Sequence, residues 1–114
     1  MTDCLFCKIV HGDINAEIVY SDTSTLAFRD INPQAPEHIL VIPRAHFASI
    51  HEIPESRKDI IPGITDTAVK IIKDLGLDKQ GYRLVMNYGE KGGQTVPHIH
   101  LHILSGRSLT WPPG

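Results

Sequence analysis

Three histidines alternate with three aliphatic residues in the stretch HIHLHIL, which runs from His98 to Leu104. Successive side chains of a β-strand point to opposite faces, so this spacing predicts a strand with the imidazoles on one face and the aliphatic side chains on the other. Three imidazoles in an apolar core would leave ring nitrogens without hydrogen-bond partners. We therefore expect the aliphatic face to pack against a helix, and the histidine face to look onto water, a ligand or a metal.

The remaining patterns predict one long and one short helix and four more strands. Apolar residues recur at helical spacing between Glu55 and Leu75, and Gly76 is placed to end that helix. Pro62 lacks an N–H, so the regular helix is expected to begin or bend near it. A short helix is expected to end at Gly12. The other predicted strands cover 17–21, 25–30, 38–44 and 82–88, with a loop at 89–93. This arrangement predicts an α+β fold with a five-stranded, mainly antiparallel sheet.

Length and charge narrow the class of protein. The 114 residues fit one domain, predicted to span 1–114. A net charge of −2 without blocks of like charge argues against a partner such as duplex nucleic acid. No apolar run reaches the roughly 18 residues that cross a bilayer, and the N-terminus does not resemble a signal peptide. We therefore expect a cytoplasmic protein without a membrane partner.

The loop before the histidine strand supplies donors for an anionic ligand. Its two glycines allow close approach of main-chain amides, and Gln94 and Thr95 add side-chain donors. A neutral imidazole can attack phosphorus while such donors stabilise the charge on the nonbridging oxygens. Two alternatives compete with this interpretation. One is a half-solvated strand that is rich in histidine, and the other is a catalytic zinc site held by three imidazoles, oriented by Asp30 or Glu37.

Taken together, these features resemble the histidine triad (HIT) family of nucleotide-binding hydrolases and transferases, whose motif is H-x-H-x-H followed by two apolar residues. The similarity is closest to the Hint branch, the purine nucleoside phosphoramidases. The segments that fit this branch are CLFCKIVHGDI, AFRDINPQAPEHILVIPRAH, GYRLVMNYGEKGGQ and GRSLTWPPG. The resemblance implies a HIT-like fold and a homodimer whose two five-stranded sheets join into one. It also implies hydrolysis of purine nucleoside phosphoramidates to the nucleoside monophosphate and an amine, with no metal required for catalysis.

The resemblance also implies roles for single residues. His100 would attack the α-phosphorus through Nε2, and the main-chain carbonyl of His98 would accept a hydrogen bond from its Nδ1. His38 would lie behind His100 and would form the catalytic group together with the three histidines of the motif. Asp30 would accept hydrogen bonds from the ribose. The phosphate would be held by Asn87, Gly93, Gln94, Thr95, His100 and His102, and the base by Phe6, Ile9, Ile14, Phe28 and Leu40.

Each assignment has a structural alternative. Phe28, like Ile9 and Leu40, fits an ordinary core, and Asp30 fits an Asx-turn before Pro33. Pro97 stands where the branch usually has an aromatic residue, and it lacks the amide hydrogen that strand pairing uses. Two other functions remain open, because other histidine triad branches hydrolyse dinucleoside polyphosphates with the same nucleophile, and a protein that binds purine nucleotides can act as a regulator without turnover.

Cys4 and Cys7 have the spacing of zinc ligands, but a tetrahedral site needs two further ligands, which must be histidines. Two buried, inert thiols are the alternative. Some bacterial proteins that resemble this chain bind zinc through such a cysteine pair, a histidine three residues after the strand-ending proline, and the first triad histidine. The resemblance therefore implies a structural zinc site at Cys4, Cys7, His46 and His98, separate from catalysis.

Overall fold

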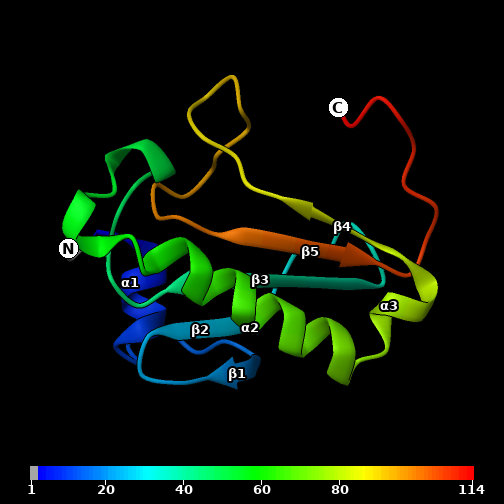
Figure 1. Ribbon diagram of the computed structural model, residues 1–114, viewed down its shortest axis with the longest axis horizontal. Helices are drawn as coiled ribbons and strands as arrows, with labels where there is room; N and C mark the ends of the chain where they lie inside the picture. The colour runs from blue at the N-terminus through cyan, green and yellow to red at the C-terminus, as the bar shows by residue number, and fades with distance from the viewer. Residues whose placement is uncertain (1–2) are drawn as a thin grey trace.

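A five-stranded antiparallel sheet with the order β1-β2-β3-β5-β4 organises the computed structural model, which describes residues 3–114 (Figure 1). The strands are β1 (Ile18–Ser21), β2 (Thr25–Arg29), β3 (Glu37–Pro43), β4 (Tyr82–Val85) and β5 (Leu101–Ser105). The helices are α1 (Leu5–Val10), α2 (Ile60–Asp74) and the short α3 (Leu77–Gln80), with 3-10 turns at Ile50–Glu52 and Glu55–Arg57. The predicted α+β fold is confirmed. Residues 1–2 of the predicted domain lie outside the described part.

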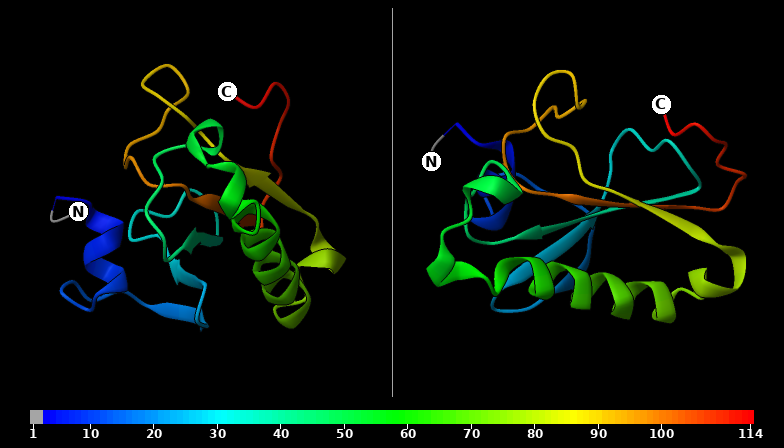
Figure 2. Two further views of the ribbon diagram at one scale, coloured as in Figure 1. Left: turned by 60° about the vertical axis from the view of Figure 1, so that its left-hand side comes forward. Right: turned by 45° about the horizontal axis from the view of Figure 1, so that its top comes forward.

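The two longer helices cover opposite faces of the sheet (Figure 2). On the α2 side, Ile39 and Val41 of β3 share a buried core with Leu101 and Ile103 of β5, and Ile64 lies at the α2 side of that core. On the α1 side, the alternate residues of β2 and β3 pack with the helix in a second cluster. Its buried members are Cys4, Phe6, Cys7, Leu26, Phe28, Leu40 and Ile42. The prediction that the aliphatic face of HIHLHIL packs against a helix is confirmed.

The ends of α2 follow from its proline and glycine. Pro62 is the third residue of the helix, so its missing N–H falls in the first turn, where no intrahelical acceptor exists. The next amide, that of Gly63, donates to the carbonyl of Asp59 at 3.0 Å. Gly76 has φ +68°, the left-handed conformation that glycine adopts without a steric penalty, and it ends the helix as predicted.

Two strand boundaries differ from the prediction by three residues. The histidine strand begins at Leu101 rather than His98, because Pro97 has no amide hydrogen and the amide of Ile99 donates to the carbonyl of Phe47 at 2.8 Å instead of joining the sheet. Strand β4 ends at Val85 rather than residue 88, and residues 86–100 then form the loop that rises above the sheet in Figure 1. The alternation nevertheless persists, since Ile99 lies in the α2 core.

No helix within residues 3–114 is both long enough and apolar enough to cross a membrane.

Candidate active site and metal centre

A cavity of about 230 Å³ lies on the α1 side of the sheet, between α1, the end of β2 and the histidine segment. Its wall is mostly apolar, and its polar residues are Asn15, Arg29, Asp30, Thr95 and two histidines. Such a slot suits a flat apolar ligand with a polar group at one end. The predicted residues on the wall are Phe6, Ile9, Ile14, Phe28, Asp30, Leu40, Thr95, His100 and His102.

The sequence interpretation missed part of this wall. Ile31 is 95% exposed at the rim, and its apolar side chain in a polar loop is a signal that marks such a position. Asn15 follows Ile14 directly, but nothing in the sequence pattern distinguishes it from a turn residue. The other unpredicted wall residues are Leu5, Ala16, Arg29 and Val96.

Three residues predicted to hold phosphate do not line this cavity. Gln94 closes its own loop, since its Oε1 accepts from the amide of Gly89 at 3.1 Å and its Nε2 donates to the carbonyl of Ala48 at 2.8 Å. The side-chain oxygen and one of the two N–H groups of Nε2 are therefore used within the protein, and Gln94 is not among the residues that line the cavity. Asn87 lies on a separate pocket of about 50 Å³. Gly93 is close to Asn87 and also lies off the cavity wall.

His100 is held in one tautomer by the main chain. Its Nδ1 lies 2.7 Å from the carbonyl oxygen of His98, as the sequence analysis predicted. A carbonyl can only accept, so Nδ1 carries the hydrogen. Burial lowers the pKa of His100, which keeps the ring neutral near pH 7 and leaves the lone pair on Nε2. The imidazole is thus oriented as a nucleophile.

The side chain of His98 is directed away from the cavity, into a cluster with two thiols. Its Nε2 donates to the carbonyl of Pro43 at 2.9 Å, so the lone pair is on Nδ1. That Nδ1 lies 3.4 Å from Sγ of Cys4, 3.6 Å from Sγ of Cys7 and 3.2 Å from Nδ1 of His46. Burial lowers the pKa of His98 to about 4, so the ring stays neutral, as a metal ligand must.

The four predicted zinc ligands fit a tetrahedral ion. All four ligand atoms lie within 4.8 Å of one another. A zinc ion with Zn–N near 2.0 Å and Zn–S near 2.3 Å places its ligands about 3.3–3.8 Å apart. The distances from His98 and the 3.3 Å between Sγ of Cys7 and Nδ1 of His46 are close to these edges. The carbonyl of Pro43 supplies the outer hydrogen bond that metal-binding histidines usually have.

Helix α1 connects the cluster to the cavity. Cys4 caps the helix, and its Sγ accepts from the amide of Cys7 at 3.4 Å. Phe6 lies between the two cysteines and makes edge-on ring contacts with Phe28, with centroids 5.5 Å apart, and with His98, at 5.9 Å. The helix therefore presents the thiols of Cys4 and Cys7 to the cluster with His46 and His98, and the ring of Phe6 to the cavity.

His38 lies behind His102, with its Nε2 2.9 Å from Nδ1 of that ring and 3.5 Å from Oδ2 of Asp30. Burial lowers the pKa of His38. Burial, followed by the charges of the neighbouring histidines, lowers the pKa of His102 to about 4. Both rings are therefore neutral near pH 7.

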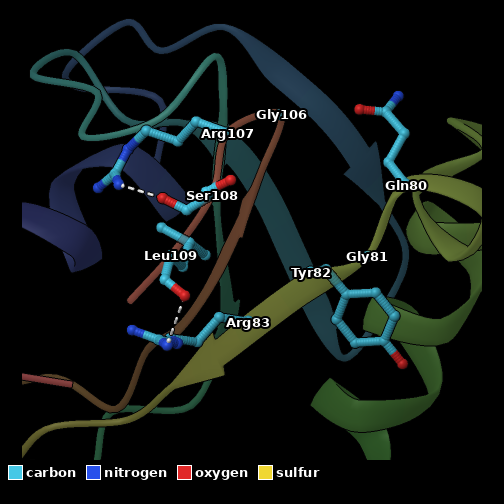
Figure 3. Close-up of a pocket in the computed structure, with 8 residues that line it drawn as sticks. All are labelled: Gln80, Gly81, Tyr82, Arg83, Gly106, Arg107, Ser108 and Leu109. Atoms are coloured by element: carbon cyan, nitrogen blue, oxygen red, sulfur yellow. Dashed lines mark hydrogen bonds between the residues drawn. The ribbon is translucent and has the colours of Figure 1, made fainter. Parts of the chain in front are cut away.

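A larger cavity, of about 520 Å³, lies between β4 and the C-terminal tail (Figure 3). Its two guanidinium groups donate to main-chain carbonyls, Arg83 to Leu109 at 3.4 Å and to Thr110 at 2.9 Å, and Arg107 to Ser108 at 3.0 Å. Among the described residues that line it there is no histidine, cysteine or carboxylate. The cavity of about 230 Å³ beside α1 is therefore the candidate active site.

Comparisons with known proteins agree with this geometry. The family described as HIT domain matches residues 11–109. The chain is 48% identical to an uncharacterized HIT-like protein of Synechococcus elongatus, covering 98% of this chain and 97% of that protein. It is 43% identical to a 14 kDa zinc-binding protein of Brassica juncea, covering 98% and 100%. The solved structure of a HIT family hydrolase from Legionella pneumophila superposes with a TM-score of 0.94 at 50% identity, covering 98% and 100%.

Proposed function

Because this chain belongs to the HIT domain family, we propose that it is a hydrolase of the Hint type that cleaves the P–N bond of purine nucleoside phosphoramidates. The observation that carries the proposal is the 2.7 Å contact between Nδ1 of His100 and the carbonyl of His98. That contact leaves the Nε2 lone pair of a neutral, buried imidazole at the wall of the cavity of about 230 Å³. The Legionella relative is described as a hydrolase, which supports the reaction class.

In the proposed first step, Nε2 of His100 forms a bond to the α-phosphorus and the P–N bond to the amine breaks. The electron pair leaves with the amine nitrogen, which takes up a proton from solvent. The ring then carries phosphorus on Nε2 and hydrogen on Nδ1, so it is cationic, and the carbonyl of His98 stabilises that charge. Water next attacks phosphorus and loses a proton to solvent, the bond to His100 breaks, and the nucleoside monophosphate leaves as the neutral imidazole is restored.

The cavity wall supplies the binding contacts of the proposal. Phe6, Phe28 and Leu40 line the cavity, and a purine there would bury apolar surface against them. Asp30 is placed to accept from ribose hydroxyls. Thr95 supplies a hydroxyl donor for a phosphate oxygen.

Turnover on an adenosine phosphoramidate, measured beside turnover on a dinucleoside polyphosphate, tests the assignment. Preference for the phosphoramidate supports it, and preference for the polyphosphate would move the chain to another branch of the family. Binding of adenosine monophosphate without turnover on either substrate would favour a regulator that only binds nucleotides.

We further propose that zinc occupies the cluster of Cys4, Cys7, His46 and His98. The donor set of two sulfurs and two imidazole nitrogens is typical of closed structural zinc sites, which leave no position for substrate. When bound, the ion would cross-link α1 to the histidine segment and stabilise the fold. No step of the reaction uses it. The zinc-binding relative from Brassica juncea supports this proposal.

We also propose a homodimer and a cytoplasmic location, as the family resemblance implies. Strand β4 is at the edge of the sheet, with Tyr82 and Leu84 exposed. An exposed edge with free main-chain donors and acceptors is suited to pairing with a second copy.

A further inference from the structure

The role of His102 depends on which of its ring nitrogens carries the hydrogen. The ring lines the cavity, and its Nδ1 lies 2.9 Å from Nε2 of His38. One of these two nitrogens must donate and the other must accept. If His102 donates through Nδ1, it offers a lone pair to a ligand. If it accepts there, it offers an N–H.

The main-chain amide of Gln34 decides between the two arrangements. Its N–H lies 3.0 Å from Nδ1 of His38, and an amide can only donate, so this Nδ1 carries the lone pair. Since His38 is neutral, its hydrogen is on Nε2, which then donates to Nδ1 of His102. Asp30 provides an independent check, because its Oδ2 lies 3.5 Å from the same Nε2 and can only accept.

The amide of Gln34 is itself held firmly. The carbonyl of Gln34 accepts from Nε of Arg107 at 2.9 Å, and its side-chain amide donates to the carbonyl of Asn32 at 3.0 Å. The neighbouring prolines, Pro33 and Pro36, have no N–H of their own. The hydrogen bonds that run from the amide of Gln34 through His38 to His102 therefore begin at a fixed position in the loop between β2 and β3.

We propose that the amide of Gln34, acting through His38, makes His102 a permanent hydrogen-bond donor whose Nε2–H binds a phosphate oxygen in the cavity. The choice of phosphate rests on the proposed function, whereas the position of the hydrogen does not. The main chain thus gives the imidazoles opposite roles. The carbonyl of His98 binds Nδ1–H of His100 and leaves the lone pair on Nε2 for attack. The amide of Gln34 binds Nδ1 of His38, so that His38 donates to His102 and the hydrogen of His102 is on Nε2.

Two consequences follow for the chemistry. Asp30, His38 and His102 lie within 4.8 Å of one another, as metal ligands would, but Nε2 of His38 carries a hydrogen and cannot coordinate an ion. His102 does not serve as an acid either, since losing Nε2–H from a neutral ring would leave an imidazolate. It stabilises charge on the phosphate throughout the reaction.

Long-range ¹H–¹⁵N spectra of the full chain, which report the hydrogen on each ring nitrogen, test the proposal without substrate. We expect His102 to be protonated on Nε2 and bare on Nδ1 at pH 7. His38→Leu keeps the packing volume and removes the donor, so His102 should populate both tautomers, and adenosine monophosphate should bind about tenfold more weakly. His38→Gln retains an N–H donor and should recover a large part of that loss. Val69→Ala, at an exposed site on α2, is the control, with both readouts unchanged.

An ester at position 34, made by incorporating the α-hydroxy acid, removes the donating N–H alone. It should loosen the tautomer of His102 as His38→Leu does, and it gives a second measurement if that variant does not fold. A hydrogen on Nδ1 of His102 in the natural chain would overturn the proposal, as would equal binding by the Leu and Gln variants, which a packing role predicts. A protein with the expected spectra but no turnover would overturn the proposed function instead.

Discussion

The ring of Phe6 meets the ring of His100 edge-on, with centroids 5.0 Å apart and an interplanar angle of 86°. Phe6 is carried by α1 between Cys4 and Cys7, and His100 receives its orientation from the main chain of His98. The two residues therefore join the helix that holds the thiols to the ring proposed as the nucleophile. A substitution in α1 or at His98 is therefore expected to change the cavity.

Phe6→Leu is expected to weaken binding of adenosine monophosphate about three- to tenfold, because edge-on aromatic pairs contribute roughly 0.5–1.5 kcal/mol beyond their buried area. Titration calorimetry measures the affinity. Val69→Ala, an exposed site on α2 across the sheet, is the control. An unchanged affinity for the Leu variant would remove Phe6 from the base slot.

Replacing His100 by alanine should lower turnover of an adenosine phosphoramidate roughly 10⁴-fold or more while nucleotide binding is largely kept. His98 cannot replace the proposed nucleophile, since the lone pair of His98 faces the cysteines. Mass spectrometry of a quenched reaction should locate the nucleotidyl adduct on His100 in the natural chain. An adduct on His102 would contradict both the mechanism and its assignment as a donor.

Cys4→Ser/Cys7→Ser should abolish zinc binding, from about one ion per chain to a small fraction. Loss of a tightly bound ion should lower the melting temperature by about 10 °C. Elemental analysis of protein purified without chelator, followed by calorimetry, provides both readouts. His51→Ala lies outside the cluster and is the matched control. Zinc at the same low level in every preparation would end the proposal of a structural site.

Asp22 should make stability depend on pH in the turn between β1 and β2. The amides of Ser24 and Thr25 donate to its Oδ1 at 2.8 Å each and lower its pKa to about 2. The unfolded value is near 3.9, so the stabilisation is complete above about pH 4 and disappears as the pH falls through about 2.

Asp22→Asn should therefore cost about 1 kcal/mol at pH 7, allowing for solvent screening at this exposed turn, and the difference from the natural chain should shrink toward pH 2. Urea unfolding at both pH values measures it. Parallel curves for the two proteins across that range would show that the carboxylate charge contributes nothing.

Leu84→Lys should dissociate the proposed dimer, because it places a charge on the exposed edge strand β4. Light scattering should give half the mass of the natural chain. Val69→Lys introduces the same charge on the exposed side of α2 and should leave the mass unchanged. A natural chain that is already monomeric would contradict the dimer directly.

Sequence patterns predicted the features that depend on local periodicity. The alternation of HIHLHIL predicted which side chains face α2, and Gly76 predicted the end of that helix. The predicted start of β5 was wrong because it depends on Phe47, which is 52 positions away in the chain and whose carbonyl accepts from the amide of Ile99. The hydrogen bond of Gln94 could not be predicted for the same reason, since its partner is the distant carbonyl of Ala48.

The hydrogen positions on the imidazoles are a further property that spacing does not encode. They depend on whether the nearest main-chain group is a carbonyl, as for His98 and His100, or an amide, as for His38. The sequence motif of alternating histidines does not specify these main-chain partners. The fold of the surrounding loops determines which ring nitrogen carries the hydrogen.

The register of β5 restricts how this chain can change in length. Leu40 pairs with His102 and Val41 with Leu101, so a shift by one position would turn every side chain of the strand to the other face. A single-residue insertion within Leu101–Ser105 would turn His102 toward α2 and expose aliphatic side chains to the cavity. Proteins descended from a common ancestor with this chain should therefore tolerate insertions and deletions in the 89–93 loop, while the length of the segment Leu101–Ser105 stays constant.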